Sequence, residues 1–176
     1  MAKLEFRNLW RNHPTNNSNQ LPCRRDNGKP TYHNQCAVRM GVCLRLSGVK
    51  PSQLSGLIDC GVHPYDQMHF IRAQQLANRL ASASGGIDGL GPVEKLTKDR
   101  PADFANELYG RRGLIFLMDY WSRRGESASG NATGDHIDLW DGYRTTASWL
   151  MEYFSWLGYY GGYSGAKQIW FWPIES

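Results

Sequence analysis

Apolar and polar residues alternate with a helical period through much of the first half of the chain. Two long segments, 34–47 and 69–83, repeat apolar side chains every three or four residues, which predicts a helix in each. The first segment is apolar around much of its circumference, as expected of a helix in the core. Shorter segments at 3–12, 101–109 and 145–157 show a similar pattern and predict further helices.

The second half of the chain carries the patterns of β-strands. Residues 113–121, GLIFLMDYW, form an unbroken apolar run that is typical of a buried central strand. Residues 136–143, HIDLWDGY, alternate as a strand does, and residues 167–174, KQIWFWPI, predict a strand that ends at Pro173. Because helices come first and strands later, we predict an α+β fold in which N-terminal helices pack on an antiparallel sheet. Residues 1–176 should form a single domain.

Composition and charge limit the classes of protein and partner that we expect. The 176 residues are 41% hydrophobic and 20% charged, which is typical of a folded globular chain. The net charge is +4, but the arginine pairs are scattered, so nucleic acid is not an expected partner. The N-terminus lacks the apolar centre of a signal peptide, and no segment has the roughly 18 apolar residues of a membrane span. We expect synthesis in the cytoplasm without a signal peptide.

Four cysteines lie at positions 23, 36, 43 and 60. They form no C-x-x-C pair, and no H-x₃-H pair accompanies them, so the spacing argues against a structural zinc site. Cys23 and Cys60 could form a disulfide, but the sequence does not show whether they do. We therefore expect no metal and no cofactor.

Cys36 stands where the helix over 34–47 begins. A helix N-terminus favours a thiolate through its free backbone N–H groups and the positive end of the helix dipole. His136 begins a predicted strand and could act as a base, and Asp138 lies two residues on, on the same face of that strand. Asp141 points to the other face. A cysteine at the start of a helix is also often a small buried core residue. A histidine at the start of a strand is often simply a polar residue at a sheet edge.

The sequence segments around Cys36 and His136 are more informative about the protein family than the two residues alone. One segment, YHNQCAVRMG, contains Asn34, Cys36, Arg39 and Met40, and the other, GDHIDLWDG, contains His136 and the residues 139–142. Together these segments, one hundred residues apart, resemble the motifs of the fourth family of type VI secretion amidase effectors.

The resemblance implies a papain-like cysteine peptidase fold with Cys36 as nucleophile and His136 as general base. It also implies hydrolysis of the amide between γ-D-glutamate and meso-diaminopimelate in peptidoglycan stem peptides. Such an enzyme would be delivered by the secretion apparatus into the periplasm of a target bacterium, and the producer would carry a cognate immunity protein. Members of the family place an acidic third catalytic residue some way beyond the strand that carries the histidine. In this chain that region reads RTTAS, residues 144–148, and contains no carboxylate. Asp138 is the expected substitute, with Asp141 as the alternative.

A non-catalytic cell-wall or glycan-binding module is the competing hypothesis. The C-terminal region is rich in aromatic residues that could stack on sugars, namely Trp149, Trp156, Tyr159, Tyr160 and Tyr163. The same residues would equally suit a core. A binding module would retain peptidoglycan without cutting it.

Overall fold

The computed structural model describes residues 3–83, 86–96, 104–121, 133–146 and 166–175. Helices occupy most of the first part: α1 (Phe6–Asn12), α2 (Cys36–Leu46), α3 (Ala73–Ala83) and the short α4 (Phe104–Glu107). The strands are β1 (Glu94–Leu96), β2 (Gly113–Trp121), β3 (Gly134–Trp140) and β4 (Gln168–Pro173). The predicted α+β order is confirmed in these residues.

The four described strands form one antiparallel sheet in the order β1-β4-β2-β3. The predicted central strand, β2, pairs with β3 on one side and with β4 on the other. Its pairing with β3 shifts between Leu117 and Trp121, and Asp119 within that interval has φ +50°. The strand order places β3 at one edge of the described sheet, and α2 and α3 contact it there.

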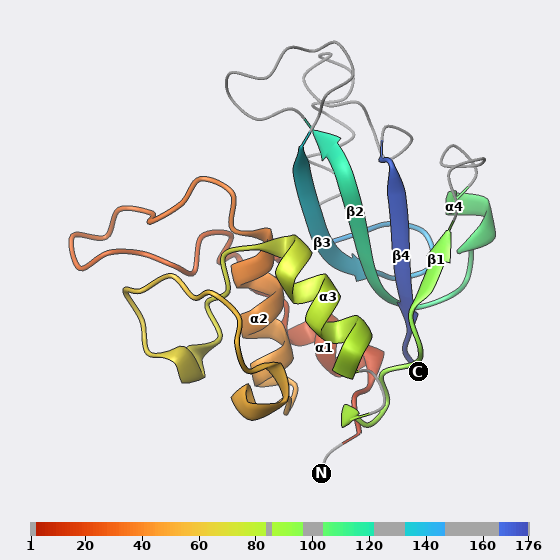
Figure 1. The fold of residues 1–176 in the computed structure, drawn as a ribbon, viewed down its shortest axis with the longest axis horizontal. Helices are drawn as coiled ribbons and strands as arrows, with labels where there is room; N and C mark the ends of the chain where they lie inside the picture. Colours follow the sequence, from red (N-terminus) through yellow and green to blue (C-terminus); the bar gives the residue numbers. More distant parts are fainter. Residues whose placement is uncertain (1–2, 84–85, 97–103, 122–132, 147–165, 176) are drawn as a thin grey trace.

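The helices α1, α2 and α3 gather beside this edge, as Figure 1 shows, while β1 and α4 lie at the opposite edge. The long segments before α2 and between α2 and α3 extend on the side of α2 away from the sheet. The main core joins residues of α1, α2 and α3 to apolar side chains of β2, β3 and β4, such as Phe116, Leu139 and Trp172. A smaller cluster around Ile115, Trp140 and Phe171 covers the alternate positions of the strands.

Several predicted elements differ from the structure in their bounds or lie partly outside the described residues. The helix predicted over 69–83 begins only at Ala73, because Met68 has φ +56° and the next residues pair with another segment. Phe70 forms a β-bridge with Asp59, and the Ile71 N–H donates to the Ile58 carbonyl at 3.1 Å. The helix predicted over 101–109 is seen as α4, although residues 97–103 lie outside the described part. The helix predicted over 145–157 falls almost wholly outside it.

The described helices are short, and none of them combines the length and the apolar character that crossing a bilayer requires.

Candidate active site

Cys36 is the first residue of α2, and its side chain lines a cleft. The thiol is buried, with 5% of the residue exposed, and the cleft beside it has a volume of about 590 Å³. Asn34, Phe70, Arg72 and Asp135 are among the other lining residues. The segment before α2, the segment before α3 and strand β3 therefore all contribute to the walls. The sulfur is therefore buried and adjacent to open space.

The backbone around Cys36 is held by side chains of the two preceding residues. The Cys36 N–H donates to Asn34 Oδ1 at 3.1 Å. Gln35 is buried, and its side chain accepts from the Cys23 N–H and donates to the Cys23 carbonyl, both at 2.8 Å. Gln35 also donates to the Tyr32 carbonyl at 3.0 Å. These bonds fix the long segment before α2 against the residue that precedes the cysteine.

His136 lies in β3, next to Cys36 in space although one hundred residues away in sequence. Its ring is buried and forms a hydrogen bond with the Cys36 thiol. The Cys36 Sγ also lies 3.9 Å from the carbonyl oxygen of Asp135, the neighbour of His136 in β3. The edge position of β3 brings its side chains within reach of the first turn of α2.

Asp138 is also buried and contacts the same histidine. His136 Nε2 lies 3.3 Å from Asp138 Oδ2, as expected for residues two apart on one face of a strand. The other carboxylate oxygen accepts from the Leu139 N–H at 2.8 Å and from the Thr146 hydroxyl. The structure thus places a thiol, an imidazole and a carboxylate in one connected row.

The electrostatics of this row favour separated charges. Burial alone would raise the pKa of the Cys36 thiol, but the hydrogen bond with His136 and the positive charges of His136 and Arg39 lower it. Burial alone would lower the pKa of His136, whereas its hydrogen bonds to Asp138 and Cys36 raise it to about 9. Burial would likewise raise the pKa of Asp138, but His136 and His13 hold it well below the usual range. These shifts favour the thiolate of Cys36, the imidazolium of His136 and the carboxylate of Asp138 relative to the same groups in isolation.

His13 and Thr146 belong to the site but could not be recognised in the sequence. His13 Nε2 lies 3.6 Å from Asp138 Oδ1, and the ring is 1% exposed. Burial lowers the pKa of His13 to about 4, despite the attraction of the Asp138 carboxylate. His13 precedes a proline in a loop, and Thr146, which falls in the helix predicted over 145–157, lies in a turn. No sequence pattern therefore connects either residue with His136.

Asp141, the alternative third residue, contacts a turn instead of the histidine. Its Oδ1 accepts from the backbone N–H groups of Tyr143 and Arg144, each at 2.9 Å. Its Oδ2 lies 3.6 Å from the Arg144 guanidinium. These contacts shape the turn that follows β3, and Asp138 remains the carboxylate that contacts His136.

Among the described residues, one group of side chains could hold a metal ion, and it lies outside this row: Cys23, Cys60, His63 and His69. The spacing of these residues argued against zinc, yet the fold brings them together.

The comparisons with known proteins agree with the motifs. The family described as type VI secretion system (T6SS) amidase effector protein 4, or Tae4, matches residues 32–172. No curated protein sequence matches the chain.

Solved structures share the fold at low sequence identity. The chain is similar to the type VI effector Tae4 from Enterobacter cloacae, with a TM-score of 0.61 and 14% identity, over 99% of this chain and 98% of that chain. The Tae4–Tai4 effector–immunity complex from the same organism gives a TM-score of 0.60 and 16% identity, over 99% and 100% of the two chains. The Tae4/Tai4 system from Salmonella typhimurium gives 0.52 and 20%, over 82% and 76%. Because the family matches most of the chain, this protein belongs to the Tae4 family of type VI secretion amidase effectors.

Proposed function

We propose that this chain is a papain-like cysteine amidase that hydrolyses the bond between γ-D-glutamate and meso-diaminopimelate in peptidoglycan stem peptides. It would act as an antibacterial effector in the periplasm of target bacteria. The observation that carries the proposal is the buried row of Cys36, His136 and Asp138, which opens into the cleft through the cysteine. Family membership supplies the amidase chemistry.

Cys36 would attack as a thiolate. Its sulfur forms a bond to the stem-peptide carbonyl carbon, and the carbonyl electrons move to oxygen. Protonated His136 then gives its proton to the leaving amine nitrogen as the C–N bond breaks. Neutral His136 next takes a proton from water, whose oxygen attacks the thioester and releases the acid and the thiolate. Asp138 keeps the ring oriented and stabilises its positive charge.

Two features of the cleft bear on how the substrate would bind. Arg72 and Asp135 line it together with Cys36, so both signs of charge face the bound peptide. This suits meso-diaminopimelate, which carries both an ammonium and a carboxylate group. The Cys36 N–H is bonded to Asn34 Oδ1, so the carbonyl oxygen would have to displace that side chain to use this donor as an oxyanion hole.

A cognate immunity protein is the expected partner in the producing cell. Tae4 proteins of Enterobacter cloacae and Salmonella typhimurium form effector–immunity systems with Tai4. We propose that this chain is inhibited by a protein of the same kind.

The test is digestion of purified peptidoglycan by the wild-type protein and by Cys36→Ala, followed by mass spectrometry of the muropeptides. The wild type should release stems cut between D-glutamate and meso-diaminopimelate, and Cys36→Ala should release none. Cys43→Ala is the matched control, because Cys43 lies in the same helix and its thiol donates to the Leu9 carbonyl, in the core. It should keep the activity.

Two outcomes would overturn the proposal. Undiminished cleavage by Cys36→Ala would exclude cysteine catalysis. Wild-type protein that binds sacculi and yields no new muropeptides would favour the binding-module hypothesis, whose aromatic residues lie outside the described part of the chain.

A further inference from the structure

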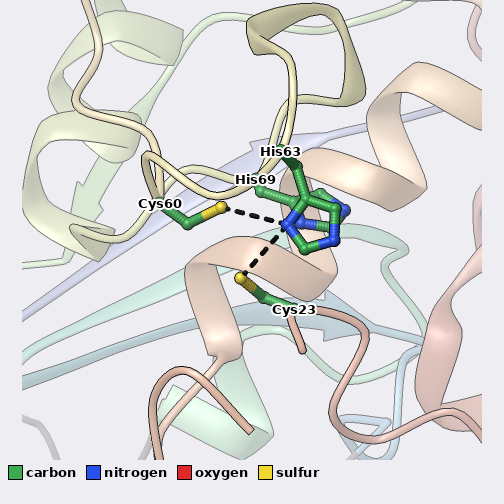
Figure 2. Close-up of side chains that lie close together, drawn as sticks. All are labelled: Cys23, Cys60, His63 and His69. Atoms are coloured by element: carbon green, nitrogen blue, oxygen red, sulfur yellow. Dashed lines mark hydrogen bonds between the residues drawn. The ribbon is translucent and has the colours of Figure 1, made fainter. Parts of the chain in front are cut away.

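Four side chains from the two long segments that flank α2 meet on the side of α2 away from the sheet. They are Cys23 from the segment before α2, Cys60 and His63 from the segment after α2, and His69 from the extended segment before α3. Figure 2 shows the two sulfurs directed at the His63 ring, with the His69 ring beside it. One possible ligand atom from each residue lies within 4.8 Å of all the others.

Two sulfur–nitrogen distances agree with the edges of a zinc tetrahedron. His63 Nδ1 lies 3.3 Å from Cys60 Sγ and 3.7 Å from Cys23 Sγ. In a tetrahedral site with Zn–S bonds of about 2.3 Å and Zn–N bonds of about 2.0 Å, sulfur and nitrogen ligands stand about 3.5 Å apart. The two measured distances bracket that value. The arrangement needs only small side-chain movements to receive an ion.

The surroundings leave a buried nitrogen without a partner. Cys23 is fully buried, and Cys60 and His69 are each 6% exposed. The Nδ1 atom of His69 is buried and has no hydrogen-bond partner among the described residues. A buried polar atom without a partner costs about 1–3 kcal/mol. Apolar residues, including Val38 and Val42 of α2, pack around the two sulfurs and keep water away from them.

We propose that Cys23, Cys60, His63 and His69 bind one Zn²⁺ ion as a structural Cys₂His₂ site. Two thiolates and two imidazoles are a ligand set that zinc prefers, and four protein ligands close its coordination shell. Each thiol gives its proton to solvent as its S–Zn bond forms, so the bound site is electrically neutral. No oxidant is needed, and both cysteines are free thiols in the structure.

A Cys23–Cys60 disulfide is the competing use of the two sulfurs. It would account for the cysteines but would leave the convergence of His63 and His69 unexplained. The four residues together favour the metal.

The site would support the wall of the catalytic cleft. The Cys23 backbone is bound by Gln35, which directly precedes Cys36. Phe70 and Ile71, which directly follow His69, line the cleft. Zinc would therefore tie together two segments that border the thiol. The proposal itself does not depend on the amidase activity.

The test measures zinc directly. Full-length protein is purified under reducing conditions from cells grown with added zinc, and its metal content is determined by plasma mass spectrometry. The wild type should contain one zinc ion per chain. His63→Ala, at a half-exposed position, should lose at least about nine-tenths of it, and so should Cys60→Ser. Cys43→Ser, outside the cluster, and Cys36→Ala should retain the full zinc content.

Cobalt supplies a second measurement on the same proteins. After chelation under reducing conditions, the wild type should bind Co²⁺ with the visible bands of a tetrahedral thiolate site, and His63→Ala should lose those bands. Equal zinc in wild type and His63→Ala would overturn the proposal, as would reduced wild type that binds neither metal. Peptide mapping that finds a Cys23–Cys60 disulfide in protein that takes up no zinc after reduction would also overturn it. Because Cys36→Ala separates zinc content from cleavage, failure of this proposal is distinguishable from failure of the proposed function.

Discussion

The carboxylate of Asp138 is placed among groups that favour its charge. It contacts His136 at 3.3 Å and accepts from the Leu139 N–H and the Thr146 hydroxyl. Such bonds compensate for the loss of water around a buried charge. Asp138 also raises the pKa of His136, so its effect reaches the thiol through the histidine.

Replacing Asp138 should therefore impair catalysis more than binding. Asp138→Asn keeps the size but removes the charge, so the imidazolium is less stable and the ring is free to adopt the wrong tautomer. We expect kcat for muropeptide cleavage to fall about 10²–10⁴-fold with little change in KM. The pKa of His136, followed by NMR, should fall from about 9.

Asp141→Asn is the matched control. Its carboxylate contacts only the turn 141–144 among the residues that the structure describes, so kcat should stay within about twofold. A larger loss in Asp141→Asn than in Asp138→Asn would assign the orienting role to the other residue.

The candidate site could be predicted from the sequence only for those residues whose positions follow from the period of a helix or a strand. Cys36 follows from the start of a helix, and Asp138 follows from the two-residue period of the strand that carries His136. His13 and Thr146 reach Asp138 only through tertiary folding, which no period in the sequence specifies. The four residues of the proposed zinc site escape recognition for the same reason, since they lie in loops and Cys23 is 37 residues from Cys60 in sequence.

At the scale of elements, α2 is constrained by the segment before α3, which passes close to Gly41. A Cβ atom at Gly41 would lie 2.0 Å from the Met68 carbonyl oxygen and 3.0 Å from a Phe70 ring carbon. Glycine therefore lets the segment before α3 pass directly against the helix. That segment contains His69 and reaches the cleft at Phe70.

Gly41→Ala tests this contact with two opposing effects. Alanine in a helix interior is favoured over glycine by about 1 kcal/mol. The clash with backbone should cost more, because overpacking costs about 1–3 kcal/mol and the Met68 carbonyl cannot rotate away as a side chain does. We expect a net loss in the free energy of unfolding, measured by urea denaturation. Gly86→Ala, where a Cβ would meet no atom within 4 Å, should be neutral. A stabilised Gly41→Ala protein would contradict the close approach.

The elements themselves were largely predictable. Strand β2 follows from an unbroken apolar run, β3 from alternation, β4 from a short apolar segment that ends at proline, and α2 from helical periodicity. The predicted start of α3 was wrong by four residues. Met68, which has a left-handed backbone, and the β-bridge between Phe70 and Asp59 override a helical pattern that continues through 69–72. Strand β1 has three residues, too few for a pattern.

At the scale of the whole molecule, buried histidines make folding sensitive to acid. Burial lowers the pKa of His13 to about 4, below its ordinary value of 6.5. Burial, together with His63 and Arg45, likewise lowers the pKa of His69 to about 4. The unfolded chain therefore binds protons between pH 6.5 and 4 that the folded chain does not, and stability falls as pH falls through that window. His136, with its pKa raised to about 9, loses its contribution only as pH rises above 6.5.

His13→Gln should flatten this dependence. The free energy of unfolding of the wild type should fall between pH 6.5 and 4, and the variant should lose up to about 1.4 kcal/mol per pH unit of that slope. Urea denaturation at a series of pH values gives both slopes. Identical slopes would mean that His13 is charged in the folded protein, in contact with Asp138.

The separation of Cys36 in α2 from His136 in β3 has a consequence for the cell that makes this protein. The pKa of the Cys36 thiol is lowered only when α2 docks beside β3, so a nascent chain that has not yet folded carries an ordinary cysteine. Under the proposed mechanism, toxicity is a property of the finished fold. A chain that is still unfolded during synthesis would therefore lack the proposed activity until its tertiary structure is complete.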